Sequence, residues 1–438
     1  MEKLRQYWYN VHSSFWFIPG LIIIVSIALA IGLIKADPFI DRQMLDRWPR
    51  LFGVGVEGSR ALLEAIASSM ITVAGTVFSI TLVALALASS QYTSRVLRTF
   101  MRNRVNQTVL GMFVGIFAYC LVVLRTIQGE DTGEVFVPSL AVLFGMVLGF
   151  IGIAFLILFI HNIAVSIQAS HIIADVSEET LKAVNHLFPE EVIGVEDTGD
   201  RWPGPDYEGQ VWRIVPATET GYIQQIDIDV LLSFAEERGV LVRVEQGIGE
   251  FLVEGTPAVS ILTTNLLNEK DVRRLGSVYT VGKERSMDQD VSFGIRQLVD
   301  MALRALSPGI NDTTTAIMCI NYLTAILVCL INRRIESCYR TADGRVRVLA
   351  RGPTFAGLMM ESFDQIRQNA GGNVAVLTRM LQSLETLADS TLIATRRRVL
   401  LDHAKAVVEL GHRSVPSPSD RQYIISQSAR LITTLDTQ

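Results

Sequence analysis

Hydrophobic residues gather in the first 170 positions of the chain, in four runs long enough to cross a bilayer, for which about 20 residues are needed. The runs cover residues 15–35, 65–90, 108–127 and 136–163. The last run is long, and we expect its helix to continue without a break through His161 and Ser170. The first run has no small-residue cleavage site, which favours an anchor over a signal peptide. The pattern therefore predicts a membrane protein with four transmembrane α-helices.

The second run carries a stripe of small and hydroxyl-bearing residues. Positions that alternate in steps of three and four lie on one side of a helix, and here they are Ser69, Thr72, Thr76, Ser79, Val83, Ala86 and Ser90. A row of hydroxyls inside a membrane favours a contact with protein or water over one with lipid. Two interpretations stay open, a seam between packed helices and the lining of a pore. In a pore, Val83 and Ala86 would form an apolar ring that gates by dewetting.

The loop after the second run predicts the orientation of the chain. It holds four arginines and no acidic residue, namely Arg95, Arg98, Arg102 and Arg104. Because lysine and arginine accumulate in cytoplasmic loops, this loop and both termini are expected in the cytoplasm. The same arginines are candidates for binding anionic lipid headgroups or for a basic vestibule at the cytoplasmic side.

Beyond the four-helix transmembrane domain (residues 1–170), the pattern changes and predicts a cytoplasmic α+β region. Residues 171–206 indicate a juxtamembrane helix and a linker rich in Pro, Gly and acids. Residues 207–285 contain short β-rich runs such as GYIQQIDI around one helical segment, which predicts a small β-barrel or sandwich. Residues 286–438 are predicted to be mainly helical, with a β-hairpin around Asp343 and Gly344.

The segment 313–330 is apolar on nearly every side. Asn321 and an apolar length of about 16 residues favour a buried helix or a subunit contact over a fifth span. The sequence SPGIND before it predicts a turn that ends one helix and caps the next. The residues of this turn kept as structural or regulatory candidates are Ser307, Pro308, Gly309, Asn311 and Asp312.

The remaining chemistry is sparse. Hydrophobic residues make up 49% of the chain and charged residues 19%, and the net charge of −5 gives no reason to expect a nucleic-acid partner. The four cysteines lack zinc-site spacing, and no catalytic motif is present, so we expect no metal, no cofactor and no enzyme activity. His171 and Asp175 share a helix face and are interpreted as an ordinary juxtamembrane pair. A charged cluster around the first cytoplasmic helix is the other structural or regulatory candidate: Arg285, Gln289, Asp290, Arg296 and Asp300.

Several segments together resemble a bacterial family of membrane proteins known as domain of unknown function 2254 (DUF2254). They are the four spans, SSQYTSRVLRTFMRNR, GYIQQIDID, FLVEGTP and, most specifically, QDVSFGIRQLVDMALRALSPGIND. In the family a proline usually follows the last Asn and Asp, where this chain has Thr313, so the local turn can differ. The resemblance implies a bacterial inner-membrane protein with a cytoplasmic domain and carries no established activity.

Two functions from different classes follow from these patterns. The first is a homo-oligomeric ion channel or pore, with the second span toward the axis and a cytoplasmic sensing or gating domain. The second is a non-conducting membrane scaffold or sensor whose cytoplasmic domain binds a protein partner or a small ligand. The expected partners are the lipid bilayer and further copies of the chain.

Overall fold

The computed structural model describes residues 16–37, 55–91, 104–128, 136–166, 168–188, 211–287, 289–335 and 339–436; among these, the side chains of 87–91 and 166 are not described. The chain divides into two compact units, Met1–His171 and Ile172–Gln438. Each unit is described by itself.

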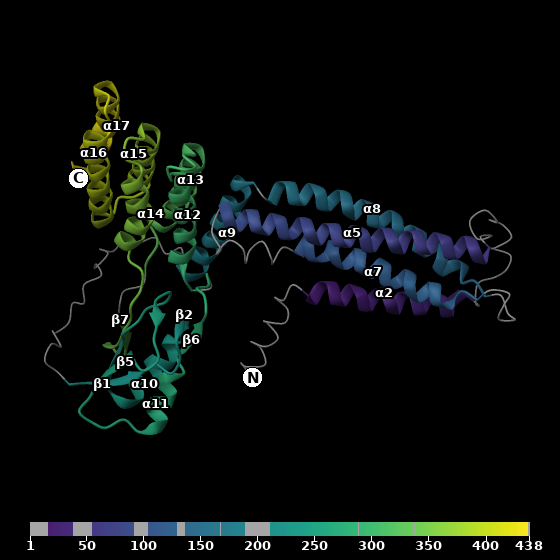
Figure 1. Ribbon diagram of the computed structural model, residues 1–438. Helices are drawn as coiled ribbons and strands as arrows, with labels where there is room; N and C mark the ends of the chain where they lie inside the picture. The colour runs from purple at the N-terminus through teal and green to yellow at the C-terminus, as the bar shows by residue number, and fades with distance from the viewer. Residues whose placement is uncertain are drawn as a thin grey trace. The chain divides into compact units, whose positions relative to one another are not determined.

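Unit 1 is a bundle of four long helices that run side by side (Figure 1): α2 (Phe17–Ala36), α5 (Val56–Gln91), α7 (Arg104–Thr126) and α8 (Ser139–Ser166). Five helices of the described chain are long and apolar enough to cross a membrane, these four and α13 (Thr313–Leu330) of unit 2. The helices of unit 1 match the four predicted runs, although α5 begins nine residues earlier than expected.

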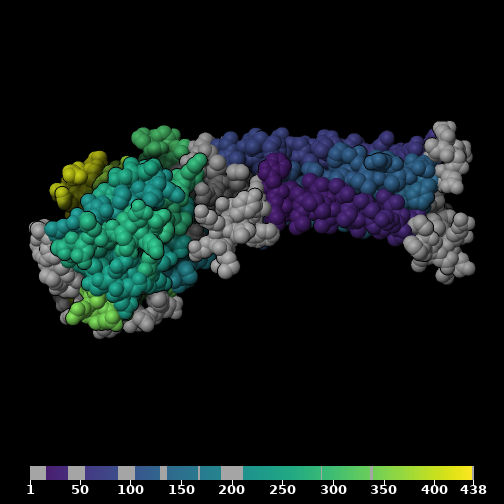
Figure 2. All heavy atoms as spheres, turned by 90° about the horizontal axis from the view of Figure 1, so that it is seen from below, coloured from purple at the N-terminus to yellow at the C-terminus, as the bar shows by residue number. Residues whose placement is uncertain are grey.

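Helix α7 is the most buried of the four because it packs against α2, α5 and α8. Gly111 and Gly115 lie one turn apart on its face toward α2. A Cβ at Gly111 would come within 2.9 Å of the Pro19 Cα, and one at Gly115 within 2.7 Å of the Ser26 Oγ. Small residues at this spacing let two helix backbones approach closely. Helix α2, purple in Figure 2, lies along the surface of unit 1.

Polar contacts fasten the helix ends at one side of the bundle. The carboxylate of Asp37, just after α2, accepts a 2.9 Å hydrogen bond from the Leu140 N–H in the first turn of α8. Arg60 donates to the carbonyl of Ile127, and the Tyr119 hydroxyl donates to the carbonyl of Ala141. The first of these bonds satisfies a backbone N–H that α8 leaves open at its start, and the other two hold neighbouring helices together.

The expectation of an unbroken helix through His161 and Ser170 is wrong. Helix α8 ends at Ser166, and a new helix, α9 (Ala169–Leu187), begins three residues later. Helix α8 is apolar on all sides, whereas α9 buries one face, with Ile173, Val176 and Val184 fully buried. No glycine or proline marks the break.

The first part of unit 2 contains eight strands and two helices. In chain order they are β1 (Trp212–Pro216), β2 (Gly221–Ile226), α10 (Ile228–Arg238), β3 (Leu241–Val244), β4 (Phe251–Leu252), β5 (Pro257–Leu262), α11 (Glu269–Gly276), β6 (Tyr279–Gly282), β7 (Tyr339–Ala342) and β8 (Arg345–Leu349). They form a five-stranded sheet in the order β1-β5-β3-β8-β7 and a three-stranded sheet in the order β4-β2-β6. Side chains from both sheets and both helices share one core. The described strands do not close into a barrel.

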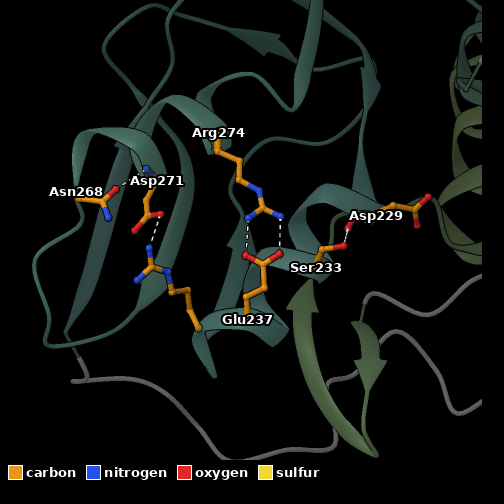
Figure 3. Close-up of polar contacts among 7 residues, drawn as sticks. Asp229, Ser233, Glu237, Asn268, Asp271 and Arg274 are labelled. Atoms are coloured by element: carbon orange, nitrogen blue, oxygen red, sulfur yellow. Dashed lines mark hydrogen bonds and ion pairs between the residues drawn. The ribbon is translucent and has the colours of Figure 1, made fainter.

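The β7–β8 hairpin turns at Asp343 and Gly344, as predicted, and both residues have positive φ. The sequence patterns did not predict which sheet this hairpin joins. Strand β8 pairs in parallel with β3, about 100 residues earlier in the chain, and so extends the five-stranded sheet. Helices α10 and α11 are linked by exposed ion pairs (Figure 3). Arg274 contacts both oxygens of Glu237, and Arg238 contacts Asp271 at 2.8 Å. Such exposed pairs orient α11 and add little stability.

The second part of unit 2 is a stack of helices: α12 (Val291–Ala305), α13, α14 (Phe355–Asn369), α15 (Val374–Asp389), α16 (Ala394–Ser414) and α17 (Pro418–Asp436). Figure 1 shows the six helices stacked side by side, with α12 and α13 at one end and α16 and α17 at the other, and within the stack α14 packs on α12 and α15 on α13. Helix α13 packs against α12, α14 and α15, and the face that it turns to them is fully buried: Ala316, Cys319, Ile320, Leu323, Ile326, Leu327 and Leu330. In unit 2 this helix is a core element.

Buried arginines tie the ends of these helices together. Arg396, which is 1% exposed, donates to the carbonyls of Leu330 and Ile331 at the end of α13, and to that of Arg333. Arg333 in turn donates to the carbonyls of Val184 and Phe188 at the end of α9. A guanidinium suits this position because its several donors satisfy the open carbonyls and its charge complements the negative end of the helix dipole.

Candidate functional site

The stripe on α5 points away from the other helices of unit 1. The face of α5 that packs on α7 and α8 is formed by Leu63, Ala67, Met70, Ala74, Val77 and Ala84, all of them buried. At 100° per residue the stripe lies on the opposite side of the helix, and its described members are all exposed: Ser69, Thr72, Thr76, Ser79, Val83 and Ala86. The side chain of Ser90 lies outside the described residues. Among the described helices of unit 1, the stripe is therefore not a packing seam.

The hydroxyls of the stripe bond to their own helix. Thr72 donates to the carbonyl of Ser68 at 2.7 Å, Thr76 to that of Thr72 at 3.1 Å, and Ser79 to that of Gly75 at 2.9 Å. Because a hydroxyl has only one hydrogen to donate, these side chains offer oxygen lone pairs to whatever lies beside the helix. Bulky apolar side chains, such as Ile71, Phe78 and Leu82, flank the stripe.

A polar pair that the sequence did not single out lies between α7 and α8. Asn162 donates from its side-chain amide to the Oδ1 of Asn106 at 3.0 Å. Asn106 is 4% exposed, and its own amide nitrogen has no hydrogen-bond partner within the described part of the chain. In the sequence, the signal for this pair was an asparagine near the end of each of two apolar runs. Arg104 begins α7. Arg95, Arg98 and Arg102 lie outside the described residues.

The predicted charged cluster does assemble at the start of α12. Arg285 holds both oxygens of Asp290, at 2.8 and 3.0 Å, and Asp290 also caps α12 by accepting a bond from the Phe293 N–H. Gln289 accepts a bond from the Ile226 N–H in β2. Gly249, with φ +81°, lies against the pair, and a Cβ there would be within 2.9 Å of the Arg285 Nε. The pair thus fastens the β-rich part to α12.

One turn further along α12, Arg296 pairs with Asp300 at 2.8 Å. Glu361 of α14, which no sequence pattern singled out, lies nearby and shares a hydrogen bond with Ser292. Partial burial raises the pKa of Glu361, and the hydrogen bond with Ser292 and the charges of Arg285 and Arg296 oppose that rise. A glutamate on a separate helix could be found only from the packing of α14 on α12.

The residues of the SPGIND turn form no part of this cluster. Helix α12 has 15 residues, so about 22 Å of helix separates the turn from Arg285 and Asp290. Asn311 has φ +50°, and the carboxylate of Asp312 caps α13 by accepting a bond from the Thr315 N–H. Hydrogen bonds from Thr315 lower the pKa of Asp312. Ser307 donates to the Arg304 carbonyl, and Pro308 and Gly309 lie in the turn between the helices.

The histidines, acidic residues and cysteines that metal or redox chemistry would use do not gather into one site in the described parts of the chain. His171 and Asp175 are both exposed on α9. Within the described ranges no three His, Cys, Asp or Glu side chains come together as a metal-ion site. Cys120, Cys319 and Cys329 are free thiols, and burial raises the pKa of Cys319 to about 12. Cys338 lies outside the described residues.

Comparison with known proteins places the chain among proteins of unknown function. The family model described as "Predicted membrane protein (DUF2254)" matches residues 12–386. The uncharacterized protein MT1328 of Mycobacterium tuberculosis (strain CDC 1551 / Oshkosh) is 31% identical over 436 residues, which cover 96% of this chain and 80% of the relative. The uncharacterized protein Mb1321c of Mycobacterium bovis has the same identity and coverage. No solved structure matches the chain. The chain therefore belongs to the DUF2254 family of predicted membrane proteins.

Proposed function

We propose that the protein is a homo-oligomeric, cation-preferring channel of the bacterial inner membrane, in which α5 lines the axis. In this arrangement α2, α5, α7 and α8 span the bilayer, α13 does not, and both termini and unit 2 are cytoplasmic. Unit 2 acts as the sensing or gating domain. The proposal includes no enzyme activity.

The observation that carries the proposal is the contrast between the exposed faces of the bundle. On α8 the exposed residues are large and apolar, for example Phe150, Ile153 and Ile157, of which Phe150 is 66% exposed. On α5 the face opposite the core carries serine, threonine, alanine and one valine. Large apolar side chains suit lipid, whereas a hydroxyl stripe suits protein or water. An assembly with α5 inside and α8 outside gives each face the surroundings that fit it.

The direction of the hydroxyl bonds supports a preference for cations. Thr72, Thr76 and Ser79 use their hydrogens within α5, so oxygen lone pairs face the axis. Oxygen atoms replace part of the hydration shell of a cation and offer nothing to an anion. Val83, which is 59% exposed, and Ala86 would form the narrow apolar segment of the pathway.

Single-channel recording of the purified protein in planar bilayers tests the proposal. Thr76→Trp is expected to remove most of the unitary conductance because it places an indole in the pathway. Phe78→Trp is the control, since it also introduces an indole into α5, two positions away and on another side of the helix. In a KCl gradient the reversal potential is expected to lie near the potassium equilibrium potential.

Two results would contradict the channel. One is unchanged conductance in Thr76→Trp, which would remove α5 from the pathway. The other is silence of the wild type in samples whose intact oligomers are confirmed by chemical cross-linking. The second result would favour the other candidate function, a non-conducting sensor. That candidate is supported by a pocket in unit 2 between α12 and α14.

A further inference from the structure

A pocket of about 610 Å³ is lined by the first two turns of α12, by residues 352–354 and by α14 between residues 357 and 368. Its volume lies within the range of about 300–1,000 Å³ that is usual for small-molecule sites. All of its lining residues belong to unit 2, and both walls are regular helices held together by the core. It is therefore a preformed cavity.

The charges of the residues that line the pocket do not sum to zero. Arg296 on the α12 wall is already paired with Asp300. Asp364 on the α14 wall has Arg367 and His403 at 3.5 Å each, and burial lowers the pKa of that histidine, which keeps it neutral at neutral pH. Glu361 is the third charged group of the lining.

The two arginines near Glu361 each form an ion pair with an aspartate. Arg285 is held by both oxygens of Asp290, and Arg296 is held by Asp300. The contact described for Glu361 is a hydrogen bond with the neutral Ser292. The pocket therefore carries one net negative charge, and it resides on a partly buried carboxylate. Partial burial strengthens the attraction between this carboxylate and a cation that enters the pocket.

Apolar surface lies beside this carboxylate. Met360 lines the same cavity and is 56% exposed, whereas Leu358 lies behind it in the wall at 1% exposed. A methylene chain packs well on such surface while its charged end reaches a carboxylate, as the stems of lysine and arginine do elsewhere in proteins. The thioether of methionine adapts readily to a flexible chain.

We propose that this pocket binds a small organic cation, with a primary ammonium or guanidinium group on Glu361 and a methylene stem along Met360. Two sources share this chemistry, a basic amino acid and its decarboxylated amine. They differ in one carboxylate, which Arg296 is placed to bind with the donors that Asp300 leaves over. This site is independent of conduction through unit 1.

Isothermal titration of the full-length protein in detergent tests the site with three probes of similar length. Agmatine and L-arginine are expected to bind saturably with one site per chain, and glutarate, a dianion, is expected not to bind. Glu361→Gln is expected to weaken agmatine binding at least tenfold. The matched control is Glu254→Gln, the same change at an exposed glutamate in the β4–β5 turn.

The role of Arg296 decides between the two sources. The site takes a basic amino acid if L-arginine binds more tightly than agmatine and Arg296→Gln removes that difference. The exposed control Arg398→Gln should leave the difference unchanged. If agmatine binds more tightly, the site takes an amine. Saturable glutarate binding equal to that of agmatine would overturn the proposal on the wild type alone. So would the absence of binding by both cations, or equal agmatine affinity in Glu361→Gln and the wild type.

Discussion

Replacing Gly294 by alanine would test a close contact between α9 and α12 in unit 2. A Cβ on Gly294 of α12 would lie 2.0 Å from the Oγ1 of Thr180 on α9, whereas ordinary contacts begin at 3.4 Å, so about 1.4 Å must be found by movement. Thr180 is fully buried and donates a 2.6 Å bond to the Val176 carbonyl, so its side chain cannot rotate away without losing that bond.

The expected change follows from two opposing contributions. Alanine stabilises a helix interior by about 1 kcal/mol relative to glycine. Overpacking a filled core costs about 1–3 kcal/mol, and losing the Thr180 hydrogen bond costs about 1 kcal/mol more. We expect a net loss of about 1–3 kcal/mol, which lowers the melting temperature of a unit of this size by roughly 2–10 °C.

Thermal unfolding of the full-length protein in detergent, followed by tryptophan fluorescence, measures the change. Gly309→Ala is the control because nothing lies within 4 Å of a Cβ at that position. Thr180→Ala removes the two nearest atoms and should restore part of the loss when combined with Gly294→Ala. A Gly294→Ala protein that melts at or above the wild-type temperature would refute the close contact between α9 and α12.

Two further predictions concern charged groups of unit 2. Arg396→Met should destabilise the protein by about 3–5 kcal/mol, because it leaves the buried carbonyls that end α13 without donors. The exposed control Arg398→Met should stay within about 0.5 kcal/mol in chemical denaturation, and equal midpoints for the two variants would contradict the capping role. The pKa of Glu361 is raised in the native state, so the native state keeps this proton up to a higher pH than the unfolded state does. The stability of the wild type relative to Glu361→Gln should therefore fall as the pH rises from about 4.5 through the native pKa. A difference in melting temperature that stays constant between about pH 4 and pH 7 would rule out this linkage.

Local patterns predicted the helices and turns of this chain well. The Asp312 carboxylate caps α13 as the sequence SPGIND indicates, and the Asp343–Gly344 turn forms the expected hairpin. Each depends on residues a few positions apart, whose preferences act without help from the rest of the fold.

Features that depend on distant partners could not be predicted in the same way. The parallel pairing of β3 with β8 joins segments about 100 residues apart, and Glu361 reaches Ser292 only because α14 packs on α12. No glycine or proline lies at the break between α8 and α9, so no local sequence signal predicts it. In the stripe on α5, periodicity showed which residues share a face and could not show which face is buried.

The exposed faces of unit 1 determine which helices can meet an axis. The outer residues of α2, such as Ile24 and Val25, are as large and apolar as those of α8, and α7 is covered by its neighbours. Of the described helices of this unit, α5 is the one whose exposed face offers hydroxyl oxygens and small side chains in a continuous line. Since back-bonding already satisfies these hydroxyls, lipid contact would not unfold a single chain. In the proposed channel, substitutions along the stripe should therefore change conductance or oligomer formation while leaving the melting temperature of the bundle unchanged.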